Sequence, residues 1–161
     1  MYWRREKGGK AWHAVKGEPN RYAFMSLLIG GKMTGTIALA KDRPIGWCCI
    51  GPKRSFSRFQ RSRVFAGPSE KGTWSVVCFY IAQGWRRQGI ATRLLEGAID
   101  LARAHDAEAI EAYPAKQEEC QSLVPAFAWT GIASMFAKAG FRRSPRNNRI
   151  WLLGLKGKRR Q

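Results

Sequence analysis

The pattern of apolar and polar residues along this chain predicts a sheet with two central strands. The longest strand-like run is Trp74–Ile81, and Ile45–Ile50 is a second run that is almost entirely apolar. Strands with apolar residues on both faces lie in the interior of a sheet, so we expect both runs to be buried on both sides. Shorter apolar runs predict further strands over residues 36–40, 109–113 and 150–155.

Helical spacing of apolar residues appears in three other segments. It is clearest over residues 89–105, where apolar residues recur three or four positions apart: Ile90, Leu94, Ala98, Leu101 and Ala102. Asn20 is expected to cap a helix over residues 21–29, which a pair of glycines ends. A third helix is predicted over residues 130–139, before Gly140.

The connections between these elements indicate one mixed α/β (α+β) domain. The turn residues of Lys41–Pro44 join the first two strands into a hairpin. Residues 51–72 carry Gly-Pro pairs and many basic residues, and predict a long connection. A loop longer than about 12–15 residues is either functional or a sign that an element within it is missed. Helices and strands alternate around one sheet, so we expect a single domain over residues 1–161, with a flexible tail over 156–161.

The charge of the chain raises the question of an anionic partner. There are 29 Lys and Arg against 11 Asp and Glu, which gives a formal charge of +18. Such an excess favours polyanions but also suits an enzyme whose ligand is itself an anion. The basic residues are densest over 53–63, 142–149 and 156–160.

The cysteines, histidines and hydropathy of the chain argue against a metalloprotein and against a membrane protein. The cysteines form no C-x-x-C pair, and there are only 2 histidines, so we expect no metal site. Free or buried thiols are typical of a reducing compartment. No apolar stretch is long enough to span a bilayer, and no leader-like segment follows the basic N-terminus. We therefore interpret the chain as a cytoplasmic protein without a membrane partner.

The segment that links the best strand to the best helix carries the clearest chemical signal. Its small residues, Gly89 and Ala91, let an anion approach the backbone at the start of the helix. Backbone amides there lack intrahelical partners, and the helix dipole attracts negative charge. Arg86 and Arg87 add positive charge. The pattern therefore predicts a phosphate-binding turn, unless the small residues serve only to start the helix.

This turn resembles the signature of the GNAT superfamily of acyl-CoA N-acyltransferases. The matching residues are Arg86-x-x-Gly89-x-Ala91 after an apolar strand, and a later helix followed by Gly140-Phe141 resembles the ending of that family. The resemblance covers residues 45–155. It implies a single domain with a mixed, mostly antiparallel sheet flanked by helices, acetyl-CoA (coenzyme A) as the cosubstrate, and no metal.

The resemblance also implies how coenzyme A is held. Backbone amides over 87–92 would bind its pyrophosphate, the strand edge at 79–81 would bind its pantetheine arm, and the last helix would pack against it. The thioester would lie where strands 74–81 and 109–113 splay apart. The expected cofactor-binding residues are Phe79, Tyr80, Ile81, Arg86, Arg87, Gln88, Gly89, Ile90, Ala91, Thr92 and Phe136.

Transfer of an acetyl group to a primary amine needs a base, and a strand N–H near Ile81 is expected to stabilise the oxyanion. The family often uses a tyrosine as the acid, but Phe136 stands at that position here. Tyr113 and Tyr80 are the candidate replacements, ahead of Ser134. Glu111 is the candidate base, because strand alternation directs it and Tyr113 to one face. The alternative for Glu111 is a solvated edge residue. Cys78 is expected to be inert rather than nucleophilic.

Two other functions remain open at this stage. Arg and Phe interleave over 54–59, as in a module that binds nucleic acid, unless Phe56 and Phe59 pin the loop to the core. A GNAT fold that binds coenzyme A without catalysis is the third hypothesis. For an enzyme, the positive charge favours a small neutral or acidic amine in a pocket shaped by 51–72 and 116–129. A homodimer is compatible with the family.

Overall fold

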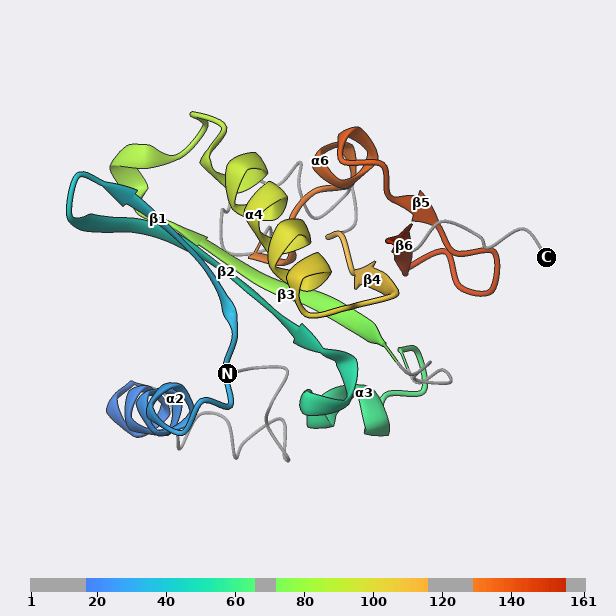
Figure 1. The fold of residues 1–161 in the computed structure, drawn as a ribbon, viewed down its shortest axis with the longest axis horizontal. Helices are drawn as coiled ribbons and strands as arrows, with labels where there is room; N and C mark the ends of the chain where they lie inside the picture. The colour runs from blue at the N-terminus through green and yellow to red at the C-terminus, as the bar shows by residue number, and fades with distance from the viewer. Residues whose placement is uncertain (1–16, 66–71, 116–128, 156–161) are drawn as a thin grey trace.

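The structure is a computed structural model that describes residues 17–65, 72–115 and 129–155 (Figure 1). Its strands are β1 (Gly35–Ala40), β2 (Arg43–Pro52), β3 (Thr73–Ile81), β4 (Ala109–Ala112), β5 (Arg142–Arg143) and β6 (Trp151–Gly154). Its helices are α2 (Glu18–Ile29), α3 (Ser57–Arg61), α4 (Ile90–Ala104) and α6 (Ala133–Lys138), with short 3-10 turns η2 (Lys53–Ser55) and η3 (Gln83–Trp85).

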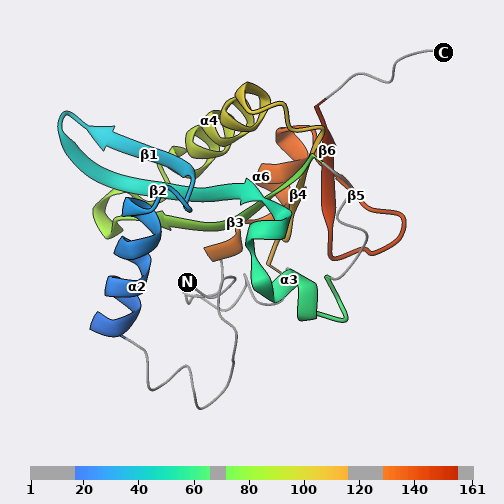
Figure 2. The same cartoon turned by 60° about the horizontal axis from the view of Figure 1, so that its bottom comes forward.

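The strands form one mixed sheet in the order β1-β2-β3-β4-β6-β5. Among the named strands of the described residues, only β3 and β4, which α4 connects, run parallel, and the other neighbouring strands are antiparallel. Helices α4 and α6 lie on one face of the sheet, whereas α2 and α3 lie on the other (Figures 1 and 2). The predicted α+β architecture with a mostly antiparallel sheet is therefore confirmed.

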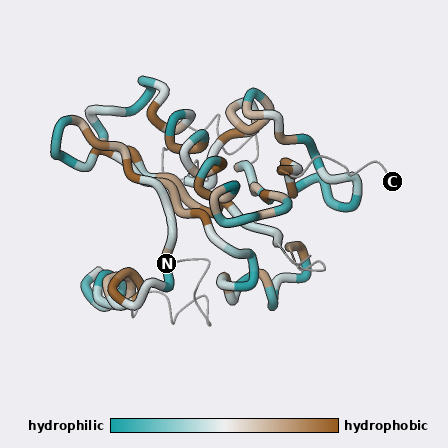
Figure 3. Tube along the Cα trace, viewed as in Figure 1, coloured by the Kyte–Doolittle hydropathy of each residue, from teal (hydrophilic) through white to brown (hydrophobic). Residues whose placement is uncertain are grey.

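Two hydrophobic clusters hold the layers together. The larger one joins α4 and α6 to the sheet and includes the fully buried Leu95 and Phe136. The smaller one lies under α3, where Phe56 packs against Phe59 and Phe59 packs against Tyr113. Figure 3 shows the apolar residues of β2 and β3 gathered at the centre of the sheet, as their sequence pattern predicts. None of the helices in the described ranges is long and apolar enough to cross a membrane.

Several predicted boundaries need correction. Helix α2 begins at Glu18 after Gly17, so Asn20 lies inside the first turn and is not the cap, because Pro19 favours a helix start at that point. The connection predicted over 51–72 is partly ordered: β2 extends to Pro52, and η2 and α3 follow. The tail 156–161, Cys120 and nearly all of the segment 116–129 lie outside the described residues.

Phe56 and Phe59 explain why the basic loop folds. They are only 1% and 2% exposed and anchor η2 and α3 to the sheet. The interleaved arginines and aromatics therefore do not present a stacking surface for bases, which was the sequence feature that favoured nucleic-acid binding.

The pairing of β3 with β4 is short. It runs from Thr73–Ala109 to Val76–Ala112, and β3 then continues to Ile81 without β4 beside it. At the same point β3 bulges, because Cys49 pairs with Cys78 whereas Ile50 pairs with Val76. A bulge increases the local twist and bends a strand. Among the described residues, the second half of β3 therefore has no partner strand on this side, and we call the place where β3 and β4 part the gap.

Candidate active site

The edge of β3 at this gap carries backbone N–H groups that find no acceptor among the described residues. The N–H of Ala82 donates to Ile45 O on β2 at 2.8 Å. Backbone groups alternate in direction along a strand, so those of Phe79 and Ile81 point away from β2 and into the gap. Arg86 Nε donates to Ile81 O at 3.1 Å. In the described part of the chain the N–H groups of Phe79 and Ile81 have no acceptor on this edge, so an extended ligand can pair with them.

The turn between β3 and α4 presents a row of amides. Arg87 and Gly89 adopt left-handed conformations with φ of 61° and 77°. Among the described residues, the N–H groups of 87–91 find no hydrogen-bond acceptor. Successive amides in such a conformation form a concave anion-binding site, and the dipole of α4 adds to it. A Cβ built on Gly89 meets no atom within 4 Å, so the turn is open to a ligand.

The side chains of this turn mainly brace the backbone. Arg86 holds the Ile81 carbonyl, and Gln88 Nε2 donates to Gly84 O at 3.1 Å. The segment from Arg86 to Gly89 is exposed, and so is Thr92, whereas Ile90 and Ala91 are half-buried. The structure therefore brings the predicted turn residues and the β3 edge together in one continuous surface.

Phe79, Tyr80 and Phe136 lie on different sides of the β3 edge. The Phe79 ring packs against Phe136 at a centroid distance of 6.2 Å, on the side of α4 and α6. Phe136 is fully buried and also contacts Phe141. Tyr80 pairs across to Trp47 and is 56% exposed. Its hydroxyl is therefore accessible to solvent, whereas Phe136 supports the strand from behind.

Glu111 belongs to a buried polar network. The Lys53 ammonium lies 2.8 Å from Glu111 Oε2, and the Tyr113 hydroxyl donates to the same oxygen at 2.6 Å. Ser75 Oγ lies 2.9 Å from the Tyr113 hydroxyl. Glu111 is only 8% exposed and Lys53 only 3%. The alternative of a solvated edge residue is therefore wrong for Glu111, and the predicted shared face of Glu111 and Tyr113 is confirmed.

Lys53 is the member of this network that the sequence did not reveal. It opens the basic cluster 53–63 and looks like one more surface cation. The available signal was indirect, because a carboxylate in an apolar strand needs a cation or hydrogen-bond donors nearby. The cation that pairs with this carboxylate is set by the path of β2, which continues past β3 into η2. That path is a property of the fold and cannot be seen in the local sequence.

Burial controls the acidity of the groups near the gap. It raises the pKa of the Tyr113 hydroxyl well above its usual value of 10, and the Glu111 carboxylate raises it further. Burial also raises the pKa of the Cys78 thiol to about 12. Both groups stay protonated at neutral pH. Tyr113 is thus a hydrogen-bond donor, and Cys78 lacks the thiolate that a nucleophile needs.

A cavity of about 710 Å³ lies over the same network, between the end of α3 and the β5–β6 connection. We call it the basic cavity, and its lining includes Lys53, Arg63, Thr73, Glu111, Arg146 and Asn147. Glu111 is the one acidic residue of this lining among the described residues. Within the described residues, no group of His, Cys, Asp and Glu side chains suits a metal ion.

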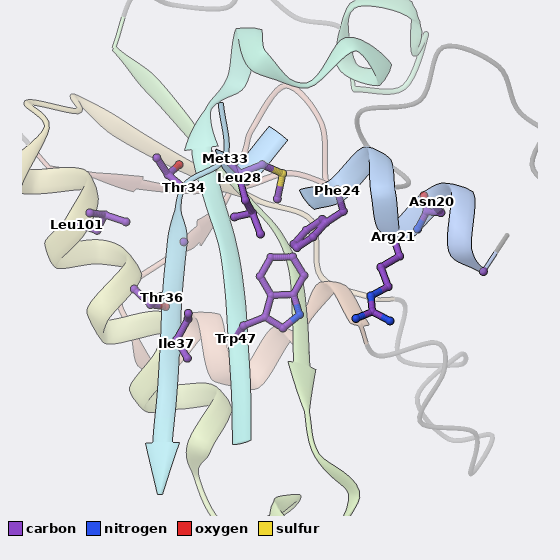
Figure 4. Close-up of a pocket in the computed structure, with 12 residues that line it drawn as sticks. Asn20, Arg21, Phe24, Leu28, Met33, Thr34, Thr36, Ile37, Trp47 and Leu101 are labelled. Atoms are coloured by element: carbon purple, nitrogen blue, oxygen red, sulfur yellow. The ribbon is translucent and has the colours of Figure 1, made fainter. Parts of the chain in front are cut away.

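A second cavity, of about 640 Å³, lies between α2 and the β1–β2 hairpin. Figure 4 shows Phe24 and Leu28 of α2 facing Trp47 across it, and the Phe24 and Trp47 rings meet edge to face at 5.3 Å. None of the residues predicted for catalysis or for coenzyme A lines this second cavity. Its largely apolar lining distinguishes it from the basic cavity.

The buried ion pair allows a test of the network. Lys53→Met leaves the Glu111 carboxylate buried without its cation, so we expect the free energy of unfolding to fall by about 3–5 kcal/mol. The double variant Lys53→Met/Glu111→Gln should recover much of this loss, because the buried charge is gone. Urea denaturation at pH 7 measures both, with the exposed Lys32→Met as a control that should change stability by less than about 0.5 kcal/mol. Equal stability of Lys53→Met and Lys32→Met would contradict the network.

Comparisons with known proteins identify the family. A family model described as acetyltransferase (GNAT) family matches residues 3–122. An N-acetyltransferase from Staphylococcus aureus Mu50 superposes with a TM-score of 0.56 at 15% identity, covering 86% of this chain and 77% of that one. No curated protein sequence matches the chain.

Two other solved structures share the fold and contain ligands. A GNAT family acetyltransferase from Brucella melitensis, in complex with acetyl-CoA, has a TM-score of 0.54 at 13% identity, covering 91% of this chain and 75% of that one. An acetyltransferase from Bacillus subtilis, in complex with CoA, has a TM-score of 0.53 at 16% identity, covering 94% and 96%. The family match spans most of the sequence, and the fold agrees with it. The chain belongs to the GNAT family of acetyltransferases.

Proposed function

We propose that this protein is an acetyl-CoA-dependent N-acetyltransferase, with one catalytic domain, that acetylates a primary amine. The observation that best supports this proposal is the continuous surface formed by the β3 edge and the free amides over 87–91. A strand edge suits the amide-containing pantetheine arm, and a row of amides suits the phosphates. The acetyl-CoA and CoA found in the Brucella and Bacillus relatives support the same ligand.

In this proposal the turn binds the negatively charged end of coenzyme A. The amides of 87–91 bind the pyrophosphate, with Arg86 and Arg87 nearby, and Thr92 stands at the first turn of α4. The amides of Phe79 and Ile81 pair with the pantetheine arm, and Phe136 supports the strand behind them. The thioester carbonyl then lies in the gap, where the Ile81 amide stabilises the oxyanion.

The chemical step is direct attack by the amine. A carbon–nitrogen bond forms, the carbon–sulfur bond breaks, the amine loses one proton, and coenzyme A leaves as a thiolate. Glu111 is the proposed base, accepting the proton through water in the basic cavity. Tyr113 orients this carboxylate through its hydrogen bond. Tyr80, with its exposed hydroxyl, is the proposed acid for the thiolate.

The cofactor turn has a matched pair of glycines for testing. A Cβ meets no atom within 4 Å at either Gly84 or Gly89, but only Gly89 has a positive φ, of 77°. Gly89→Ala should strain the turn by about 1–2 kcal/mol and reorient the amides, raising the KM for acetyl-CoA about tenfold. Gly84→Ala should leave KM nearly unchanged. Steady-state thiol release checks this, and equal KM values for the two variants would argue against an amide cradle at 87–91.

The proposed catalytic roles predict separate effects on turnover and binding. With the best amine from a panel, Glu111→Gln should lower kcat about 10²-fold or more, because general-base catalysis contributes about 10²–10⁴-fold. Tyr113→Phe and Tyr80→Phe should lower kcat less, and none should change the KM for acetyl-CoA much.

Thermal unfolding separates these roles from loss of structure. Glu111→Gln should lower kcat while the variant remains folded and its KM for acetyl-CoA stays close to the wild-type value. An unchanged rate for Glu111→Gln would refute the base. Acetyl-CoA binding without thiol release for any amine would favour the non-catalytic hypothesis, to which Phe136 at the usual tyrosine position gives some support.

A further inference from the structure

The fold brings together two basic clusters that the coenzyme A site does not use. Residues 53–63 and 142–149 are far apart in the sequence, yet both contribute to the basic cavity. Figure 2 shows the end of α3 and the β5–β6 connection on the same side of the sheet. The Asn147 side-chain amide donates a hydrogen bond to the Val64 carbonyl and ties the two segments together. The cavity is therefore closed on this side by a direct contact.

The charges that line the cavity are only partly compensated. Glu111 neutralises Lys53, but Arg63 and Arg146 have no acidic partner among the described residues. Two arginines from segments far apart in the sequence therefore line the space. A guanidinium presents paired N–H donors that match a carboxylate or a phosphate. The uncompensated charge predicts an anionic group between the two arginines.

The size and build of the cavity favour a small ligand. Its volume of about 710 Å³ falls within the usual range of about 300–1,000 Å³ for small-molecule sites. The loop that carries Arg146 is held by Ser144 N, which donates to Ile150 O at 2.8 Å, and by Asn147 Oδ1, which accepts from Arg149 N at 3.0 Å. These contacts pre-form the wall, which lowers the cost of binding.

The cavity also contains a hydrogen-bond acceptor for an amine. Glu111 lines it, and its carboxylate is the only acidic group there among the described residues. A ligand with an amine at one end and an acidic group at the other would place its amine toward Glu111 and its anion toward Arg63 and Arg146. We propose that the basic cavity binds the acceptor substrate, and that this acceptor is a small amine bearing a carboxylate or phosphate group. The assignment of the ligand as acceptor rests on the proposed acetyltransferase function.

Direct binding tests the cavity independently of catalysis. Wild-type protein should bind inorganic phosphate and succinate in a calorimetric titration, and Arg63→Ala/Arg146→Ala should bind both at least tenfold more weakly. The matched control is Arg43→Ala/Arg149→Ala, which removes the same charge from exposed residues outside the cavity lining. The control should bind like the wild type. Absence of phosphate and succinate binding, or equal weakening in both double variants, would overturn the site.

Paired amines test the ligand as acceptor. The rates of thiol release are compared for O-phosphoserine against serine and for glutamate against glutamine. The acidic member of at least one pair should have a kcat/KM at least tenfold higher, and Arg63→Ala/Arg146→Ala should remove this preference without changing the KM for acetyl-CoA. No preference in either pair would overturn the acceptor class. Phosphate binding that depends on the arginines, without any acetyl transfer, would overturn the proposed function and the acceptor assignment but leave the anion site.

Discussion

The early end of the β3–β4 pairing is the constraint on which the candidate site depends. The two parallel strands pair only as far as Val76–Ala112, and the bulge in β3 occurs at the same point. If the ladder continued, β4 would take up the backbone groups of Phe79 and Ile81. Because it stops, the edge of β3 is open, and the turn into α4 continues the same surface with its free amides. One local irregularity therefore provides both a strand edge and access to the gap.

The buried network explains how the sheet stays intact next to an opening. Lys53, Glu111, Ser75 and Tyr113 join η2, β4 and β3 one residue before the strands part. Buried charges are costly unless they are paired, so the network specifies one arrangement of these strands. The same carboxylate lines the basic cavity. Glu111 thus both stabilises the sheet and is the candidate base. Substitutions of this residue therefore need both stability and kinetic measurements.

Most of the sheet and α4 could be predicted from the sequence, because their signals are local. The apolar run Trp74–Ile81 and the helical spacing after Gly89 each depend on neighbouring residues. For the ordered segment after Pro52 the sequence predicts a long loop, because only tertiary packing shows that Phe56 and Phe59 are buried. Lys53 as the partner of Glu111 is a long-range contact of the same kind, and so is the meeting of Arg63 with Arg146 across one cavity.

Amide hydrogen exchange on addition of acetyl-CoA shows whether the β3 edge and the turn at 87–91 hold the cofactor. We expect slower exchange at Phe79, Ile81 and residues 87–91, because these amides gain acceptors, and no change in helix α2, which lies on the other face of the sheet from α4. Exchange can be followed by NMR under conditions where acetyl-CoA saturates the protein. Binding of acetyl-CoA that leaves these amides unprotected, or protects another surface instead, would contradict a cofactor site at the β3 edge.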